Sequence, residues 1–351
     1  MTSKKWTLLS MALLLGLLIL LGGATVIIDP YFHYHGPIEG LAYIMDVDRQ
    51  RYINDGISKN FEYDALMTGT SMMENARAST FERLFDVTAI KVPYEGSSFK
   101  ETDENLRRAI EANPDLRVVF RSLDFFIMVL DPEQSPYPEE LYPRYLYDDK
   151  LYNDTNYIFN KTILLENTLP VLTRTLKGES MTSFDDYSLM SAELFGMGPP
   201  DQFAPPNTAP GSAPDFFLEN TRTNVSLHIR KTIEENPQIE FYILIPPYSI
   251  IHWNDLRMRN LVDEQLDVEK EAASLLVDLE NVHLFSFYDC PDIIGDLDDY
   301  MDSCHYGAEA LDRMFEYMAE DEHRLTVENY EETFERAKKL FKEGDLAALL
   351  Q

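Results

Sequence analysis

Basic residues are scarce in this chain. It has 30 Lys and Arg against 61 Asp and Glu among 351 residues, so its formal net charge is -31 at pH 7. Proteins that bind nucleic acid or an anionic membrane surface carry concentrated positive charge. We therefore expect no nucleic acid partner and interpret the excess of acid as a strongly solvated surface.

Cysteine is nearly absent, with Cys290 and Cys304 as the only two. A disulfide between them is geometrically possible, but the sequence alone does not decide whether it forms. Cys304 directly precedes His305, yet neighbouring residues in a loop rarely point the same way. We therefore do not expect Cys304 to act as a nucleophile with that histidine.

Recognisable metal-binding patterns are also missing. The aspartate-rich stretch 289–302 lacks the glycine and the terminal glutamate of an EF-hand loop, so we interpret it as a solvated loop. His33 and His35 would share one face of an extended segment, but no third ligand lies near them in the sequence. We attribute them to an aromatic collar beside a membrane and expect neither a metal nor a cofactor.

One long uncharged run lies at residues 6–28. As a helix it would span roughly 35 Å, enough to cross a bilayer core of about 30 Å. Lys4 and Lys5 precede the run and predict a cytoplasmic tail. A cleaved signal peptide is the alternative, with Gly22-Gly-Ala24 as the passable cleavage site. We favour an uncleaved anchor with the bulk of the chain outside the cytoplasm; no cysteine follows the run, which excludes a lipoprotein.

The rest of the chain has the composition of a globular protein, with 45% hydrophobic and 26% charged residues. Short apolar runs alternate with amphipathic stretches, which predicts a parallel sheet covered by helices on both faces. A proline-rich segment at 131–215 breaks this pattern, and we interpret it as an insertion that caps the site. The predicted strands lie near residues 64–70, 87–92, 117–124, 239–247 and 282–287.

The most informative stretch runs from Asp64 to Asn75. It predicts a buried strand, a tight turn at Gly69, and a helix that begins at Ser71 and runs to about Phe85. A serine in this position would lie beyond the carboxyl end of the strand, where open α/β sheets bind ligands. Ser71-x-x-Glu74 is also a capping box, so the serine has a purely structural interpretation as well.

A second motif, Asp302-Ser-Cys-His305, lies near the other end of the chain. In a Ser-His-Asp hydrolase the histidine takes the proton of the serine, and the aspartate holds the imidazole in the required tautomer. We therefore predict Ser71 as nucleophile, His305 as base and then acid, and Asp302 as the group that orients the histidine.

Taken together, Gly69-Thr-Ser71, Gly96 after a strand, and Asp302-x-x-His305 resemble the blocks of the SGNH/GDSL hydrolase superfamily. The likeness is closer to its membrane-anchored bacterial branch, the DltD- and AlgX-like proteins. It runs from about Asp29 to about Glu320. The resemblance implies a flavodoxin-like three-layer α/β/α fold with about five parallel strands, and acyl chemistry on cell-surface polymers.

The resemblance also implies an oxyanion hole formed by the N–H groups of Ser71 and Gly96 and by an asparagine after the third strand. Asp124 stands in that region instead. An ionised Asp124 cannot donate a hydrogen bond, so it must be protonated, serve the structure or face elsewhere. Asn75 is a possible substitute donor.

Two functions of different class follow. The first is an exported, membrane-anchored serine acyltransferase or esterase for acetyl-like esters of a cell-surface polysaccharide or glycopolymer, and the resemblance implies a polytopic membrane O-acyltransferase as partner. The second is a non-catalytic SGNH-like scaffold or polymer-binding module. Tyr248 and Trp253 follow the fourth strand and are predicted to line the pocket. The predicted parts are a cytoplasmic tail (1–5), an anchor (6–28), a membrane-proximal segment (29–60), an SGNH-like domain (61–320) and a helical tail (321–351).

Overall fold

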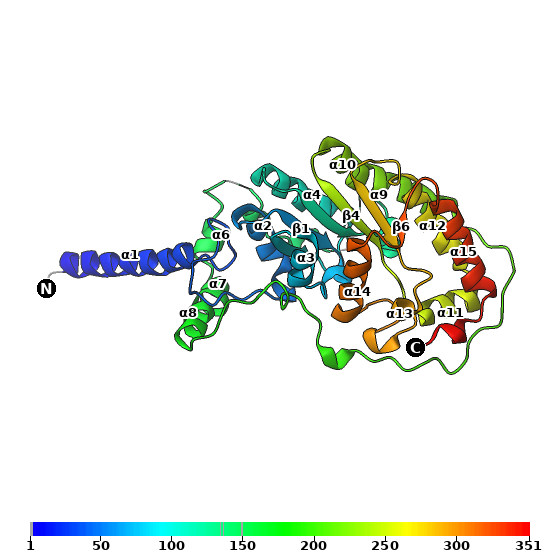
Figure 1. Ribbon diagram of the computed structural model, residues 1–351. Helices are drawn as coiled ribbons and strands as arrows, with labels where there is room; N and C mark the ends of the chain where they lie inside the picture. Colours follow the sequence, from blue (N-terminus) through cyan, green and yellow to red (C-terminus); the bar gives the residue numbers. More distant parts are fainter. Residues whose placement is uncertain (1–2, 134, 136, 149) are drawn as a thin grey trace. The chain divides into compact units, whose positions relative to one another are not determined.

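The computed structural model describes residues 3–133, 135, 137–148 and 150–351 (Figure 1). Their contacts divide the chain into two compact units. Unit 1 combines the described residues of 1–61 and 140–183, and unit 2 those of 62–139 and 184–351. The predicted insertion is therefore shared between the two units.

Unit 1 begins with the apolar helix α1, which is long and apolar enough to cross a membrane, with a mean hydropathy of 2.7. The same length and composition also suit a signal sequence. The other helices of unit 1 are short. Its helices are α1 (Ser3–Ile28), α2 (Gln50–Asn60), α6 (Thr155–Ile158), α7 (Lys161–Ile163) and α8 (Leu169–Leu176).

The segment after α1 turns sharply and is not the extended strand that we predicted. Asp29 adopts a left-handed backbone with φ 47°, and its carboxylate accepts hydrogen bonds from the N–H groups of Tyr34 and His35. The turn separates the two histidines: His33 lies 3.5 Å from Asp154, whereas His35 donates to the neighbouring Gly36 carbonyl. The two histidines therefore have different partners.

Unit 2 is built on one sheet with the strand order β2-β1-β3-β4-β5-β6. The first five strands are parallel, as predicted, because helices connect each strand to the next. The sixth was not predicted: its two residues pair antiparallel with β5. The strands are β1 (Ala65–Gly69), β2 (Ala89–Pro93), β3 (Val118–Ser122), β4 (Glu240–Ile245), β5 (Val282–Ser286) and β6 (Arg324–Leu325).

Helices cover both faces of this sheet (Figure 1). Phe120 on β3 contacts Phe81 of α3 and Phe315 of α14, at 5.7 and 5.0 Å between ring centroids. The next residue, Arg121, points to the opposite face, where it lies over the Phe99 ring of α4. The expected three-layer α/β/α fold is confirmed. The helices of unit 2 are α3 (Ala78–Phe85), α4 (Phe99–Ala112), α5 (Phe125–Met128), α9 (Asp215–Val225), α10 (Lys231–Glu235), α11 (Ile250–Arg259), α12 (Val262–Ser274), α13 (Pro291–Ile294), α14 (Ala308–Ala319) and α15 (Tyr330–Glu343).

The C-terminal helix α15 packs into unit 2. Phe341 is buried and stacks on Trp253 of α11 at 4.0 Å, and Lys338 contacts Asp267 of α12 at 2.5 Å. This helix therefore covers α11 and α12 rather than standing apart from the fold.

The strand order determines where in the sheet the candidate site lies. From β1 the chain moves to β2 on one side and then crosses to β3 on the other side of β1. In a doubly wound sheet of this order, the connections diverge where β1 and β3 end, and a crevice forms there. Ser71 follows β1 and Asp124 follows β3, so both lie at this point.

Candidate active site

A glycine makes the turn after β1 possible. Gly69 has φ 152°, and a Cβ at this position would lie 2.5 Å from both Ser122 Oγ and Met73 Cγ. A larger residue would therefore clash with the neighbouring strand end and strain the backbone. The turn delivers Ser71 to the edge of the sheet without displacing β3.

The helix after this turn is shorter than predicted. Residues Ser71–Met73 form one 3-10 turn, and α3 begins only at Ala78. Thr70, not Ser71, caps the turn: its Oγ1 accepts a hydrogen bond from the N–H of Met72 at 3.3 Å. The capping-box interpretation of Ser71 is therefore wrong, and its hydroxyl is available for other contacts.

The Ser71 hydroxyl contacts the predicted base. Ser71 Oγ lies 2.9 Å from His305 Nε2, and His305 Nδ1 lies 2.7 Å from Asp302 Oδ2. A proton on Nδ1 is donated to the carboxylate, which leaves the lone pair of Nε2 facing the serine. The three residues thus form the hydrogen-bonded chain that a serine nucleophile requires.

Asp302 is fixed by its own loop. Its second oxygen, Oδ1, accepts hydrogen bonds from the N–H groups of Cys304 and His305, both at 2.8 Å. Burial raises the pKa of Asp302, but hydrogen bonds from the His305 ring and the two amides outweigh it and lower the pKa to about 2. The hydrogen bond to Asp302 in turn raises the pKa of His305, against a smaller opposing effect of burial. Asp302 therefore stays ionised and stabilises the imidazolium form.

A cavity of about 400 Å³ lies beside the hydrogen-bonded side chains of Ser71, His305 and Asp302. The wall of the cavity includes these three residues, together with Gly96 and Asp124. Phe126 and Ile127 of α5 supply an apolar side. Within the described part of the chain, no lining residue comes from 131–215, so the predicted cap does not contribute to this wall. The volume suits a small acyl group with part of its alcohol.

Two backbone amides are candidates for an oxyanion hole. Gly96, in the connection from β2 to α4, has a left-handed backbone with φ 58°. The N–H groups of Ser71 and Gly96 donate no hydrogen bond to any described residue. Both residues line the cavity, where free N–H donors can stabilise a negatively charged oxygen.

Asp124 takes part in the site in an unexpected way. Its Oδ2 accepts hydrogen bonds from the hydroxyls of Thr70 and Ser122, so it anchors the turn that carries Ser71. Its Oδ1 is buried and has no hydrogen-bond partner among the described residues. Burial raises the pKa of Asp124 to about 6, although the two hydroxyls and His305 lower it. Burial of Asp124 therefore favours the protonated form, and its hydrogen bonds favour the ionised form.

Three other predicted residues lie outside the cavity. Asn75 is occupied: its amide donates to the Tyr306 carbonyl at 2.8 Å and accepts from the Met190 N–H at 3.0 Å. Tyr248 and Trp253 are both fully buried. They belong to the core: Tyr248 accepts a hydrogen bond from the Phe125 N–H at 3.2 Å, and Trp253 stacks on Phe341 of α15.

Thr70 is the functional residue that sequence reasoning missed. It caps the nucleophile turn and donates to Asp124. The sequence offered one signal for this role: Thr70 and Ser71 are adjacent hydroxyl residues, and only one of them can cap the turn that follows, so Thr70 was an alternative cap.

Both cysteines are free thiols. Cys304 lines the cavity, but its sulfur lies 3.7 Å from His252 Nδ1 rather than beside the His305 ring. Burial raises the pKa of the Cys304 thiol to about 12. A protonated thiol is a poor nucleophile, which agrees with the expectation for Cys304.

No protein-family model matches the chain, and no curated protein matches its sequence. Among solved structures it is similar to a protein of Streptococcus pneumoniae that is provisionally named a platelet activating factor. That similarity has a TM-score of 0.37 and 12% sequence identity, and it covers 79% of this chain and 92% of the other. A likeness at this distance carries no argument about family, so the SGNH/GDSL assignment stays a prediction, and the functional interpretation rests on the geometry of the site.

Proposed function

We propose that this protein is a serine esterase or O-acyltransferase that uses Ser71, His305 and Asp302. The observation that carries the proposal is the continuous hydrogen-bonded chain of these side chains, 2.9 and 2.7 Å per link, at the wall of a cavity. Free amides of Ser71 and Gly96 on the same wall support acyl chemistry in particular, since an acyl transfer passes through an oxyanion.

The proposed reaction has two halves. Ser71 Oγ attacks the ester carbonyl while His305 Nε2 takes its proton, and the carbonyl oxygen becomes an oxyanion held by the N–H groups of Ser71 and Gly96. The alcohol then leaves with the proton from His305, and the acyl group remains on Ser71. In the second half, His305 deprotonates water or a hydroxyl of an acceptor, which attacks the acyl-serine and frees Ser71.

The N-terminal helix supports a membrane-anchored enzyme. Gly22 of α1 is buried, and a Cβ there would lie 2.9 Å from side-chain atoms of Ile158 and Phe159. Thr25 and Ile28 are buried too. Cleavage after Ala24 would remove part of this packing, so we infer an uncleaved anchor with the site outside the cytoplasm. The substrate we infer is an acetyl-like ester of a cell-surface glycopolymer, with a polytopic membrane O-acyltransferase as the acyl source.

One observation favours a second function, a non-catalytic polymer-binding scaffold. Asp124 lines the same cavity as Ser71 and Gly96, and a negative charge beside a developing oxyanion opposes catalysis. A cavity with an acid and an apolar side could instead bind a neutral sugar.

The test uses the full-length chain in detergent. A fluorophosphonate probe should label the wild-type protein at Ser71, and the protein should hydrolyse 4-nitrophenyl acetate. Ser71→Ala should abolish both, whereas Ser303→Ala, a change of a neighbouring hydroxyl on the cavity wall, should keep the label. Wild-type protein that is folded but takes no label and hydrolyses no ester would favour the scaffold.

A further inference from the structure

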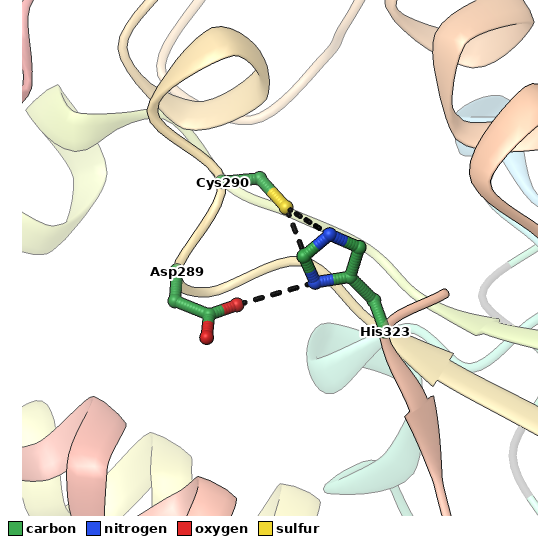
Figure 2. A group of neighbouring side chains, drawn as sticks. All are labelled: Asp289, Cys290 and His323. Carbon is green, nitrogen blue, oxygen red and sulfur yellow. Dashed lines mark hydrogen bonds and ion pairs between the residues drawn. The ribbon is translucent and has the colours of Figure 1, made fainter.

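A second cluster of reactive side chains lies in unit 2, away from the Ser71 cavity. Asp289 and Cys290 follow β5, and His323 immediately precedes β6. Figure 2 shows the three side chains pointing toward one another, and their ligand atoms all lie within 4.8 Å of each other. None of the three lines the Ser71 cavity. Sequence reasoning missed the cluster because Cys290 and His323 are 33 residues apart.

The separations suit a tetrahedral metal. His323 Nδ1 lies 3.4 Å from Cys290 Sγ and 3.4 Å from Asp289 Oδ1. For zinc bonds of about 2.1 Å to nitrogen or oxygen and about 2.3 Å to sulfur, tetrahedral ligand pairs lie about 3.4 Å (N and O) and about 3.6 Å (N and S) apart. Cys290 Sγ also lies 3.1 Å from His323 Nε2, and all the ligand atoms lie within 4.8 Å of one another, so the three groups are within reach of one ion once the imidazole turns its Nδ1 toward the sulfur.

The backbone holds these residues in place. The carbonyl of Cys290 accepts hydrogen bonds from the N–H groups of Ile293 and Ile294, which anchors it at the start of α13. His323 has a left-handed backbone with φ 59°, and its carbonyl accepts from the Ser286 N–H at 3.3 Å. A site fixed in this way requires little ordering when a ligand binds.

Charges around the cluster favour a cation. The carboxylates of Asp289, Asp292 and Glu322 lie close enough to the buried Cys290 to place it in a negative field. The same field attracts a divalent ion, which can then displace the thiol proton to water. Arg324 and Arg336 are the opposing charges that border the same cavity. Arg324 pairs with Asp321 at 3.1 Å, and Arg336 lies 3.5 Å from Asp289 Oδ2 and leaves Oδ1 facing the histidine.

An open coordination position is also available. Asp289 and His323 border a polar cavity of about 340 Å³. Ser286 lines the same cavity, is 2% exposed, and its hydroxyl has no hydrogen-bond partner among the described residues. A buried hydroxyl without a partner is costly, and a metal-bound water could satisfy it.

We propose that Asp289 Oδ1, Cys290 Sγ and His323 Nδ1 bind one divalent transition-metal ion of the Zn²⁺ class, with a water in the fourth position. Mixed carboxylate, thiolate and imidazole ligands suit this borderline-soft ion better than Ca²⁺ or Mg²⁺. The ion would tie the loop after β5 to the turn before β6. This site does not depend on the proposed esterase function.

Cobalt provides a direct spectroscopic test, because Co²⁺ substitutes for Zn²⁺ and a Co²⁺–thiolate bond absorbs in the near ultraviolet. Full-length protein is treated with a chelator, dialysed and titrated with Co²⁺. We expect one Co²⁺ per chain, a thiolate charge-transfer band, and loss of that band when Zn²⁺ is added. Zn²⁺ should also raise the melting temperature of the wild-type protein.

Variants then assign the ligands. Cys290→Ser should lose the charge-transfer band, and His323→Ala and Asp289→Asn should each weaken Co²⁺ binding by about 10-fold or more. Asp289 is exposed, so its change should leave the fold intact. Cys304→Ser and His283→Ala are matched controls that should bind as the wild type does. Absence of a thiolate band in the wild type, or a band that survives Cys290→Ser, would overturn the proposal; ester hydrolysis that persists after chelation separates this result from the Ser71 site.

Discussion

Thr70 donates a hydrogen bond from Oγ1 to Oδ2 of Asp124, and so links the turn after β1 to the end of β3. The same threonine caps the 3-10 turn that begins with Ser71. Asp124 therefore positions the nucleophile turn through one oxygen, while its other oxygen has no partner among the described residues. This arrangement explains how the carboxyl group of Asp124 holds the turn that carries Ser71.

Asp124→Asn should preserve or raise the rate of ester hydrolysis. The amide oxygen can still accept from Thr70 and Ser122, and the new NH₂ would take the place of the unpartnered oxygen, where it could donate to an oxyanion. Asp124 also contributes to the raised pKa of His305. Removing its charge should lower that pKa, so the base is free at lower pH and the acid limb of the pH–rate profile should shift downward.

The measurement is kcat/KM for an acetyl ester across the pH range, with Asp115→Asn as control. Asp115 is exposed and precedes β3, at the opposite edge of the sheet, so it makes the same charge change far from the cavity. A large loss of activity in Asp124→Asn, with an unshifted acid limb, would show that the carboxylate itself is required.

Asp302→Asn should reduce kcat by about 10³- to 10⁴-fold and leave a small residual activity. The asparagine oxygen can still accept from the amides of Cys304 and His305, so the loop should keep its shape. However, the amide cannot stabilise the imidazolium or enforce the tautomer with the Nδ1 proton. His305→Ala should abolish activity, and Asp302→Asn with the wild-type kcat would refute the assignment of Asp302.

Gly69→Ala should destabilise unit 2 by more than about 2 kcal/mol. The added methyl group meets Ser122 Oγ and Met73 Cγ at 2.5 Å, and φ 152° is unfavourable for alanine. Gly96→Ala is the matched comparison, because its backbone is also left-handed but its Cβ would meet open space. It should cost only about 1 kcal/mol. Urea unfolding measures the free energy of unfolding of both variants. Equal losses of this free energy would mean that the close contact at Gly69 does not contribute to the destabilisation.

Glu269→Gln should flatten the pH dependence of stability. Burial raises the pKa of Glu269 from 4.5 to about 8, although hydrogen bonds from Tyr288 and Gln265 lower it. Between these values the folded protein binds a proton that the unfolded chain releases. The free energy of unfolding should therefore fall with rising pH, by at most about 1.4 kcal/mol per pH unit, and glutamine removes this contribution.

Urea unfolding at about pH 5 and about pH 8 measures the effect of Glu269. The stability of Glu269→Gln relative to the wild type should increase between the two conditions. Glu104→Gln, at an exposed position of α4, should show no such change. Parallel behaviour of the two variants would contradict the assignment of a buried neutral acid.

The sequence by itself determined the local elements of the sheet and the identity of the chemical groups. Runs such as 282–287 are short, apolar and flanked by amphipathic stretches, so periodicity alone located all five parallel strands within a few residues. Short sequence motifs pointed to Ser71 and to the Asp302–His305 pair among the polar residues. The pair could be found from sequence because its members are only 3 positions apart. The two-residue β6 carries too little periodicity to be predicted.

Only the tertiary structure decided which side chains meet. Ser71 and His305 are 234 residues apart, and strand order brings them to 2.9 Å. The same packing buries Tyr248 and Trp253 and holds Asn75 in other hydrogen bonds, so none of the three lines the cavity. It also makes Thr70 the residue that caps the turn. Local sequence fixes the backbone preferences of a few neighbouring residues, whereas the contacts of a side chain depend on the strands and helices that pack beside it, and these come from distant parts of the chain.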